Sequence, residues 1–131
     1  MPKKKTLQVE VEEPLDMKAE DRDDTGANLR AALEKVSTEK GVIGYILRDS
    51  TSASVDIKDP SKIIDYAVLS AAAFESSESL SHLFGLGKVR NVVVEGKEVK
   101  VLCLTAGDQR LSVFMEKTVD HNPIYKKLTQ S

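Results

Sequence analysis

The residue types that most often carry chemistry are few and scattered in this sequence. Neither of the two histidines, His82 and His121, stands in a cluster of ligands with metal-site spacing. The single cysteine, Cys103, lies in an apolar strand-like run, where a buried thiol behaves as a small hydrophobic side chain. It does not form a nucleophilic pair with a distant histidine. We therefore expect no metal centre and no cysteine nucleophile.

Two other patterns resemble ligand sites but have simpler structural explanations. The run Gly85-Leu86-Gly87 follows a predicted helix and precedes a predicted strand, whereas phosphate-binding glycine loops precede a helix N-terminus. It reads as a helix stop. Asp49, Asp56 and Asp59 are close in sequence but lack the ligand spacing of a calcium loop, and Asp59 is already needed as a helix cap.

Three arginines remain as candidates for chemistry. Arg48, Arg90 and Arg110 flank predicted strands, and an arginine supplied in trans can complete the active site of a GTPase. Charged residues at strand ends also serve solubility alone, and we favour that explanation for each. With no catalytic constellation in view, we expect a protein that is not an enzyme and that holds no cofactor.

Length, charge and hydropathy narrow the class of protein. The chain has 131 residues, 19 basic and 21 acidic, with a formal net charge of −2, which argues against a general nucleic-acid binder. The one basic run, Lys3-Lys4-Lys5, is followed soon by acids and reads as a solvated tail. No apolar run approaches the ~20 residues needed to span a bilayer. We expect one domain located in the cytoplasm.

One long helix organises the chain, from Asp59 to Gly87. Asp59-Pro60 supplies a capping residue followed by proline at the first helical position, and Gly85 and Gly87 supply the stop. At ~100° per residue the helix has two apolar sides rather than one. One side, expected to face the chain's own sheet, holds Ile63, Tyr66, Ala67, Ala73, Phe74, Leu80 and Phe84. The other side holds Ile64, Val68, Ala71 and Ala72.

A helix with two apolar sides has two explanations. It lies buried in the core of one domain, or one side packs on the chain's own sheet and the other on a second copy. A chain of 131 residues has little material to cover both sides, so we favour the dimer.

The order of the predicted helices and strands in the remaining segments indicates the fold class. Residues 1–24 are dense in charge and favour a flexible arm, although Leu7, Val9 and Val11 alternate as in a short edge strand. A helix is expected from Asp24 or Thr25 to about Lys40. Strands are expected over 42–48, 53–58, 88–95, 98–105 and 110–116, and a short helix from Asn122-Pro123. This α-β-β-α-β-β-β-α order predicts an α+β fold with a five-stranded antiparallel sheet.

That order resembles the roadblock family, whose fold is roadblock/profilin-like. The features that carry the resemblance are the Gly-Val-Ile-Gly entry at Gly41, the alanine-rich central helix, the turn at Glu95-Gly96 and the Gly107-Asp108 turn. It runs from about Asn28 to Leu128, so we place a roadblock-like domain at 25–131. The arm of residues 1–24 has no counterpart in the family's minimal domain.

The resemblance implies a homodimer in which the long helices pack side by side. It also implies that the strand after the helix pairs with its copy, giving one ten-stranded sheet. The interface residues would be Ile64, Ala67, Val68, Ala71, Ala72, Glu75, Arg90, Val92 and Val94. The implied function is a non-enzymatic adaptor that binds a small Ras-like GTPase or acts as a scaffold subunit. The alternative is a small-ligand sensor domain, which would need a cavity between helix and sheet that Tyr66, Phe74, Leu80 and Phe84 are expected to fill.

Overall fold

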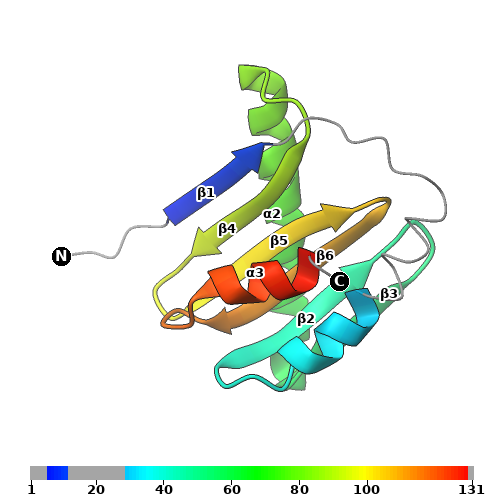
Figure 1. The fold of residues 1–131 in the computed structure, drawn as a ribbon, viewed down its shortest axis with the longest axis vertical. Coiled ribbons are helices and arrows are strands. Elements are labelled where there is room, and N and C mark those ends of the chain that lie inside the picture. The colour runs from blue at the N-terminus through cyan, green and yellow to red at the C-terminus, as the bar shows by residue number, and fades with distance from the viewer. Residues whose placement is uncertain (1–5, 12–28, 130–131) are drawn as a thin grey trace.

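The computed structural model describes residues 6–11 and 29–129 (Figure 1). Its first helix is described over residues 29–36. The further elements are β1 (Thr6–Val11), β2 (Val42–Arg48), β3 (Ala53–Ile57), the 3-10 turn η1 (Pro60–Lys62), α2 (Ile63–Phe84), β4 (Val89–Glu95), β5 (Val99–Ala106), β6 (Gln109–Glu116) and α3 (His121–Thr129). The predicted α+β class is confirmed.

The strands form a single antiparallel sheet in the order β1-β4-β5-β6-β2-β3. The helix of residues 29–36 and α3 lie on one face, and α2 crosses the opposite face (Figure 1). Gly44 allows β2 and β3 to approach, because a Cβ on it would lie 2.1 Å from the carbonyl oxygen of Asp56. All five predicted strands are present, and β1 is a sixth.

The added strand β1 corrects part of the prediction for the N-terminal arm. Within the segment expected to be a flexible arm, Thr6–Val11 pairs antiparallel with β4, from Thr6 opposite Glu95 to Val11 opposite Val89. The alternation of Leu7, Val9 and Val11 was therefore the better guide than the density of charge. Residues 1–5 and 12–24 of the predicted arm lie outside the described residues, as does the expected helix start at Asp24 or Thr25.

The ends of α2 follow the predicted signals. The Asp59 carboxylate accepts a hydrogen bond from the Ser61 N–H at 3.1 Å, and Pro60 opens a 3-10 turn that leads into the α-helix. At the other end Gly85 takes the left-handed conformation with φ 61°, and the Leu86 N–H donates to the Ser81 carbonyl at 3.1 Å. Glycine adopts this conformation without the steric cost that a Cβ brings, so the helix stops there.

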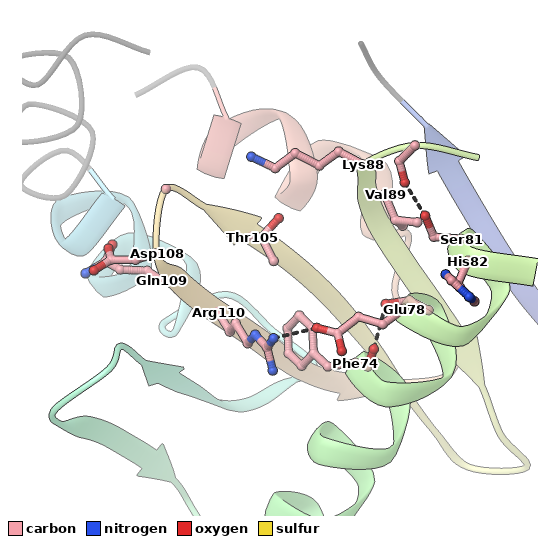
Figure 2. Close-up of a pocket in the computed structure, with 13 residues that line it drawn as sticks. Phe74, Glu78, Ser81, His82, Lys88, Val89, Thr105, Asp108, Gln109 and Arg110 are labelled. Atoms are coloured by element: carbon pink, nitrogen blue, oxygen red, sulfur yellow. Dashed lines mark hydrogen bonds and ion pairs between the residues drawn. The ribbon is translucent and has the colours of Figure 1, made fainter. Parts of the chain in front are cut away.

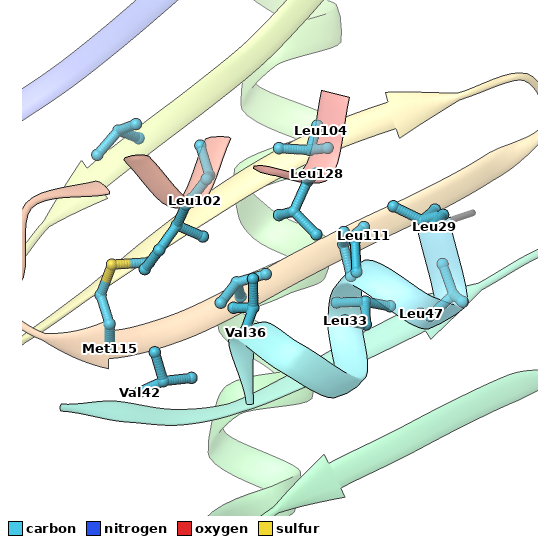
Figure 3. Packing of buried hydrophobic residues seen from close by; sticks show 14 residues of the cluster. Leu29, Leu33, Val36, Val42, Leu47, Leu102, Leu104, Leu111, Met115 and Leu128 are labelled. Carbon is cyan, nitrogen blue, oxygen red and sulfur yellow. The ribbon is translucent and has the colours of Figure 1, made fainter. Parts of the chain in front are cut away.

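The core on the face opposite α2 is built from aliphatic side chains (Figure 3). Leu29, Leu33 and Val36 recur at helical spacing and are each 1% exposed. They pack with α3 and the sheet through Ile124, Leu128, Val42, Leu47, Leu102, Leu104, Leu111 and Met115. This helix ends at residue 36, earlier than the predicted Lys40. The short helix α3 begins at His121, capped by Asp120, whose Oδ1 accepts from the Asn122 N–H at 3.0 Å.

The core beneath α2 is only partly filled by the predicted side chains. Tyr66 stacks on Phe114 of β6 with ring centroids 4.6 Å apart, and Phe74 is buried. Phe84 and Ala67, expected to face the sheet, are instead exposed, Phe84 by 69%. In Figure 1 the last turn of α2, which Phe84 ends, rises beyond the ends of β1 and β4.

Candidate interaction surface

The most unusual surface of the described residues is the solvent side of α2. Ile64 is 77% exposed and Val68 is 64% exposed, although both are large apolar side chains. Around them lie small or charged exposed residues. We call the set Ile64, Ala67, Val68, Ala71, Ala72 and Glu75 the outward α2 surface. The structure thus places all six predicted interface residues of the central helix together on the solvent side of one helix.

The three predicted interface residues of the following strand are placed differently. Val92 is 2% exposed and packs in the core beneath α2, so its side chain is already used within the protomer. Val94 is half-buried, and Arg90 is exposed where the register of β1 against β4 shifts. The outer edge of β4 is occupied by β1 of the same chain. Pairing of β4 with its copy would require β1 to leave.

A cleft of about 500 Å³ lies between the last turns of α2 and the ends of β4, β5 and β6 (Figure 2). Phe74 lines its base, and the Arg110 guanidinium lies over the Phe74 ring at 5.3 Å from the centroid. Arg110 also forms a 2.5 Å ion pair with Glu78. Other lining residues include Ser77, Ser81, His82, Lys88, Val89, Thr105 and Asp108. The expectation that aromatic side chains fill the space between helix and sheet is therefore wrong at this end of α2.

A solved structure has a similar fold. No family model matches the sequence, and no curated protein matches it. The Roadblock/LC7 domain from Streptomyces avermitilis matches with a TM-score of 0.61, covering 77% of this chain and 85% of that chain at 21% sequence identity. The chain has a roadblock-type fold.

On this roadblock-type fold the three candidate arginines do not converge on one site. Arg48 of β2 and Arg110 of β6 are register partners, so these two lie side by side on adjacent strands. Arg90 belongs to β4, which β5 separates from β6 and β2. Like charges in register repel, and the Glu78 carboxylate offsets the charge of Arg110. The paired, half-exposed Arg110 fits a structural role at the rim of the cleft.

The single cysteine and the two histidines do not form a reactive site in the described residues. Burial raises the pKa of the Cys103 thiol to about 11, and its Sγ lies 3.4 Å from Ser112 Oγ. Ser112 in turn shares a 2.5 Å hydrogen bond with Ser70 of α2, so the three side chains form a polar link between helix and sheet. His82 is exposed on α2, while His121 Nδ1 lies 3.4 Å from Lys100 Nζ. Among the described residues, no three histidine, cysteine or acidic side chains gather as metal ligands.

Sequence reasoning missed two exposed apolar side chains at the end of α2. Leu83 is 72% exposed and Phe84 is 69% exposed, next to the cleft-lining His82. Helical periodicity places Phe84 on the sheet side, but periodicity cannot tell where the sheet ends. Exposed apolar side chains therefore lie at both ends of α2, with exposed polar residues such as Glu75 and Ser79 between them. None of the helices in the described residues is long and apolar enough to cross a membrane.

Proposed function

We propose that this protein is a non-enzymatic homodimeric adaptor that binds a small Ras-like GTPase or serves as a scaffold subunit. The observation that carries the dimer is the outward α2 surface, where Ile64 and Val68 stand 77% and 64% exposed. Contiguous apolar surface of this kind on a soluble protein marks interaction sites. Two copies meeting there would remove these side chains from water.

The residues between the large side chains suit a close helix pair. Ala67, Ala71 and Ala72 are small and exposed, so two helices can approach near the lower end of the 8–10 Å range of interaxial distances. In the proposed dimer the helices lie side by side and the outer edges of the two β4 strands join the sheets. Such a two-fold platform presents each surface twice.

The GTPase partner rests on the roadblock-type fold and on the family resemblance of the sequence. The proposed mechanism is one of shape, since the platform needs no cofactor and no catalytic group. A Ras-like partner would be met in the cytoplasm, where a free buried thiol such as Cys103 stays reduced.

The dimer is tested by molar mass in solution, measured by light scattering across a hundredfold dilution. We expect a mass that rises with concentration towards twice 14.4 kDa. Ala71→Arg places a long charged side chain on the outward α2 surface and should stay monomeric while remaining folded by circular dichroism. A folded wild-type chain and a folded Ala71→Arg chain with the same concentration dependence would contradict the proposed interface.

The partner is tested with purified Ras-like GTPases loaded with GDP or with a non-hydrolysable GTP analogue. We expect binding that depends on the nucleotide and that weakens in Ala71→Arg, because the two-fold platform is lost. Equal binding to both nucleotide states, or none to any GTPase tested, would contradict the GTPase assignment and leave the scaffold role.

The cleft supports a second candidate function, a small-ligand sensor domain. Its volume of about 500 Å³ falls within the range of ~300–1,000 Å³ seen for ligand pockets. Native mass spectrometry of the purified chain distinguishes the two. A co-purifying small molecule that is lost in Arg110→Ala, on a protein that stays monomeric, would favour the sensor over the adaptor.

A further inference from the structure

Two different strands can pair with the outer edge of β4: β1 of the same chain, as observed, and β4 of a second copy, as in the proposed dimer. In the structure β1 lies on that edge, from Thr6 opposite Glu95 to Val11 opposite Val89 (Figure 1). The proposed homodimer needs the same edge for the β4 strand of a second copy. We propose that β1 is a removable occupant of the β4 edge that competes with a second copy of this chain. This inference rests on the proposed homodimer.

The way β1 is attached makes it the strand best able to leave. β5 and β6 are joined by a tight turn at Gly107-Asp108, and β2 and β3 by the turn that Asp49 closes through hydrogen bonds to Thr51 and Ser52. β1 is joined to the next described residue, Leu29, only through residues 12–28. In the sheet it pairs with β4 alone. Its removal therefore leaves every other strand pair of the sheet in place.

The edge of β4 that β1 covers would have unpaired backbone groups if β1 were absent. Asn91, Val92 and Val93 are buried, so this stretch of β4 belongs to the core. Without β1 its outward N–H and C=O groups have no strand partner, which makes an edge that readily pairs with another chain. A second copy of β4 is a fitting occupant because α2 packs on β4 and β5, so the edge adjoins the helix that bears the outward α2 surface.

The two states exclude one another on geometric grounds. Neighbouring strands lie ~4.8 Å apart, so two β1 strands inserted between two β4 strands move the protomers about 10 Å farther apart. That increase is close to the diameter of a helix with its side chains, ~10–12 Å. Helices that touch when the β4 edges meet therefore lose contact when both β1 strands are in place.

The competition sets the apparent strength of the dimer. Because β1 belongs to the same chain as β4, its pairing is intramolecular, and a second copy has to match its effective concentration at the edge. Both protomers must free their edges. If β1 occupies each edge nine-tenths of the time, both edges are free about one time in a hundred, and the apparent Kd is about hundredfold weaker than that of the released chain.

A disulfide between β1 and β4 tests the competition by locking the strand in place. Two full-length variants carry the pairs Thr6→Cys/Glu95→Cys or Leu7→Cys/Val94→Cys, each with Cys103→Ala. Adjacent antiparallel pairs alternate between wide and close Cα spacing, so one of the two variants has the close spacing. Thr6→Cys with Cys103→Ala, which has no partner cysteine within the chain, is the control.

Molar mass is then measured for the oxidised and reduced forms of the locked variants. We expect the intrachain disulfide to hold the protein monomeric across the dilution series, and reduction to restore the wild-type dimer. An oxidised protein as dimeric as the reduced one would overturn the competition and leave the helix-mediated dimer standing. A disulfide that forms only between chains would also overturn it, because β1 would then be exchanged between copies.

The opposite perturbation releases β1 from the edge. Leu7→Pro/Gln8→Pro removes two consecutive backbone N–H groups, one of which points towards β4 in an antiparallel pair. We expect the apparent Kd of the dimer to fall at least tenfold. An unchanged Kd overturns the competition. If wild type and the proline variant are both monomeric at every concentration, the proposed homodimer itself fails, which is a different result from failure of the competition.

Discussion

Replacing Ile64 and Val68, the two large apolar side chains of the outward α2 surface, should dissociate the proposed dimer without unfolding the protomer. Full burial of an isoleucine or valine side chain contributes about 1.5–3 kcal/mol. Ile64 is 77% exposed and Val68 is 64% exposed, so most of that contribution is still available to a partner. Scaled by these fractions, each side chain can add about 1–2 kcal/mol on association.

The two-fold axis doubles the effect, because each residue enters the interface from both protomers. Ile64→Gln/Val68→Gln therefore removes roughly 4–8 kcal/mol of favourable burial. A loss of about 4 kcal/mol corresponds to a thousandfold weaker Kd, so we expect an increase of at least a thousandfold. Glutamine is a good helix former, and changes at exposed sites usually alter the free energy of unfolding by less than about 0.5 kcal/mol.

The assay is light scattering over a dilution series, with urea unfolding measured at a concentration where both proteins are monomeric. Val55→Thr is the matched control, since Val55 is 44% exposed on the edge strand β3 and lies outside the proposed interface. The control should leave the Kd unchanged. A folded double variant with the Kd of the wild type would refute the reasoning from exposed apolar side chains to a dimer.

Three further predictions concern the protomer. Gly44→Ala should lower the free energy of unfolding by about 1–3 kcal/mol, because its Cβ would meet the Asp56 carbonyl and force β2 and β3 apart; a urea midpoint equal to wild type would contradict this. Cys103, buried and with its pKa raised to about 11, should resist a thiol reagent at pH 8 until the protein is unfolded in urea; rapid reaction of the native protein would contradict its placement. Asp59→Ala should lower the Tm, because the Ser61 N–H loses its acceptor. Hydrogen bonds from Ser61 hold the folded pKa of Asp59 below its ordinary 3.8, so its contribution is full above that value and disappears as pH falls through the folded pKa. The Tm gap to wild type should therefore close in strong acid; a gap that is constant down to low pH would contradict the role of the cap.

Local signals in the sequence were enough to locate most elements. Asp59, Pro60 and Gly85 act within a turn of the helix that they bound, so α2 could be predicted from its caps and its uninterrupted interior. The strands β2 to β6 alternate with turn residues such as Gly107-Asp108, and their partners are mostly sequence neighbours. Helical spacing also separated the buried Phe74 from the exposed Ile64 and Val68, which is why the outward α2 surface was found from the sequence.

What could not be predicted depends on non-local geometry. β1 pairs with a strand some eighty residues away. No local pattern in Thr6–Val11 indicates that β4 is its partner. Phe84 has the helical angle of a buried residue but lies where α2 extends past the sheet. The cleft beside Arg110 and Glu78 lies where the last turns of α2 meet the ends of β4, β5 and β6. In each case the outcome depends on how elements distant in the sequence are placed relative to one another.

The central claim, that two copies meet through the outward α2 surface, is tested most directly by single-cysteine disulfide formation. Ala71→Cys and Ala72→Cys, each with Cys103→Ala, place a thiol where two closely packed helices bring their Cα atoms within the ~7 Å that a disulfide requires. Val55→Cys in the same background is the control. We predict that mild oxidation gives an interchain disulfide in at least one of the α2 variants and none in the control. A protein that is dimeric by mass but forms no disulfide at either α2 position, or forms one at Val55→Cys, would contradict the account.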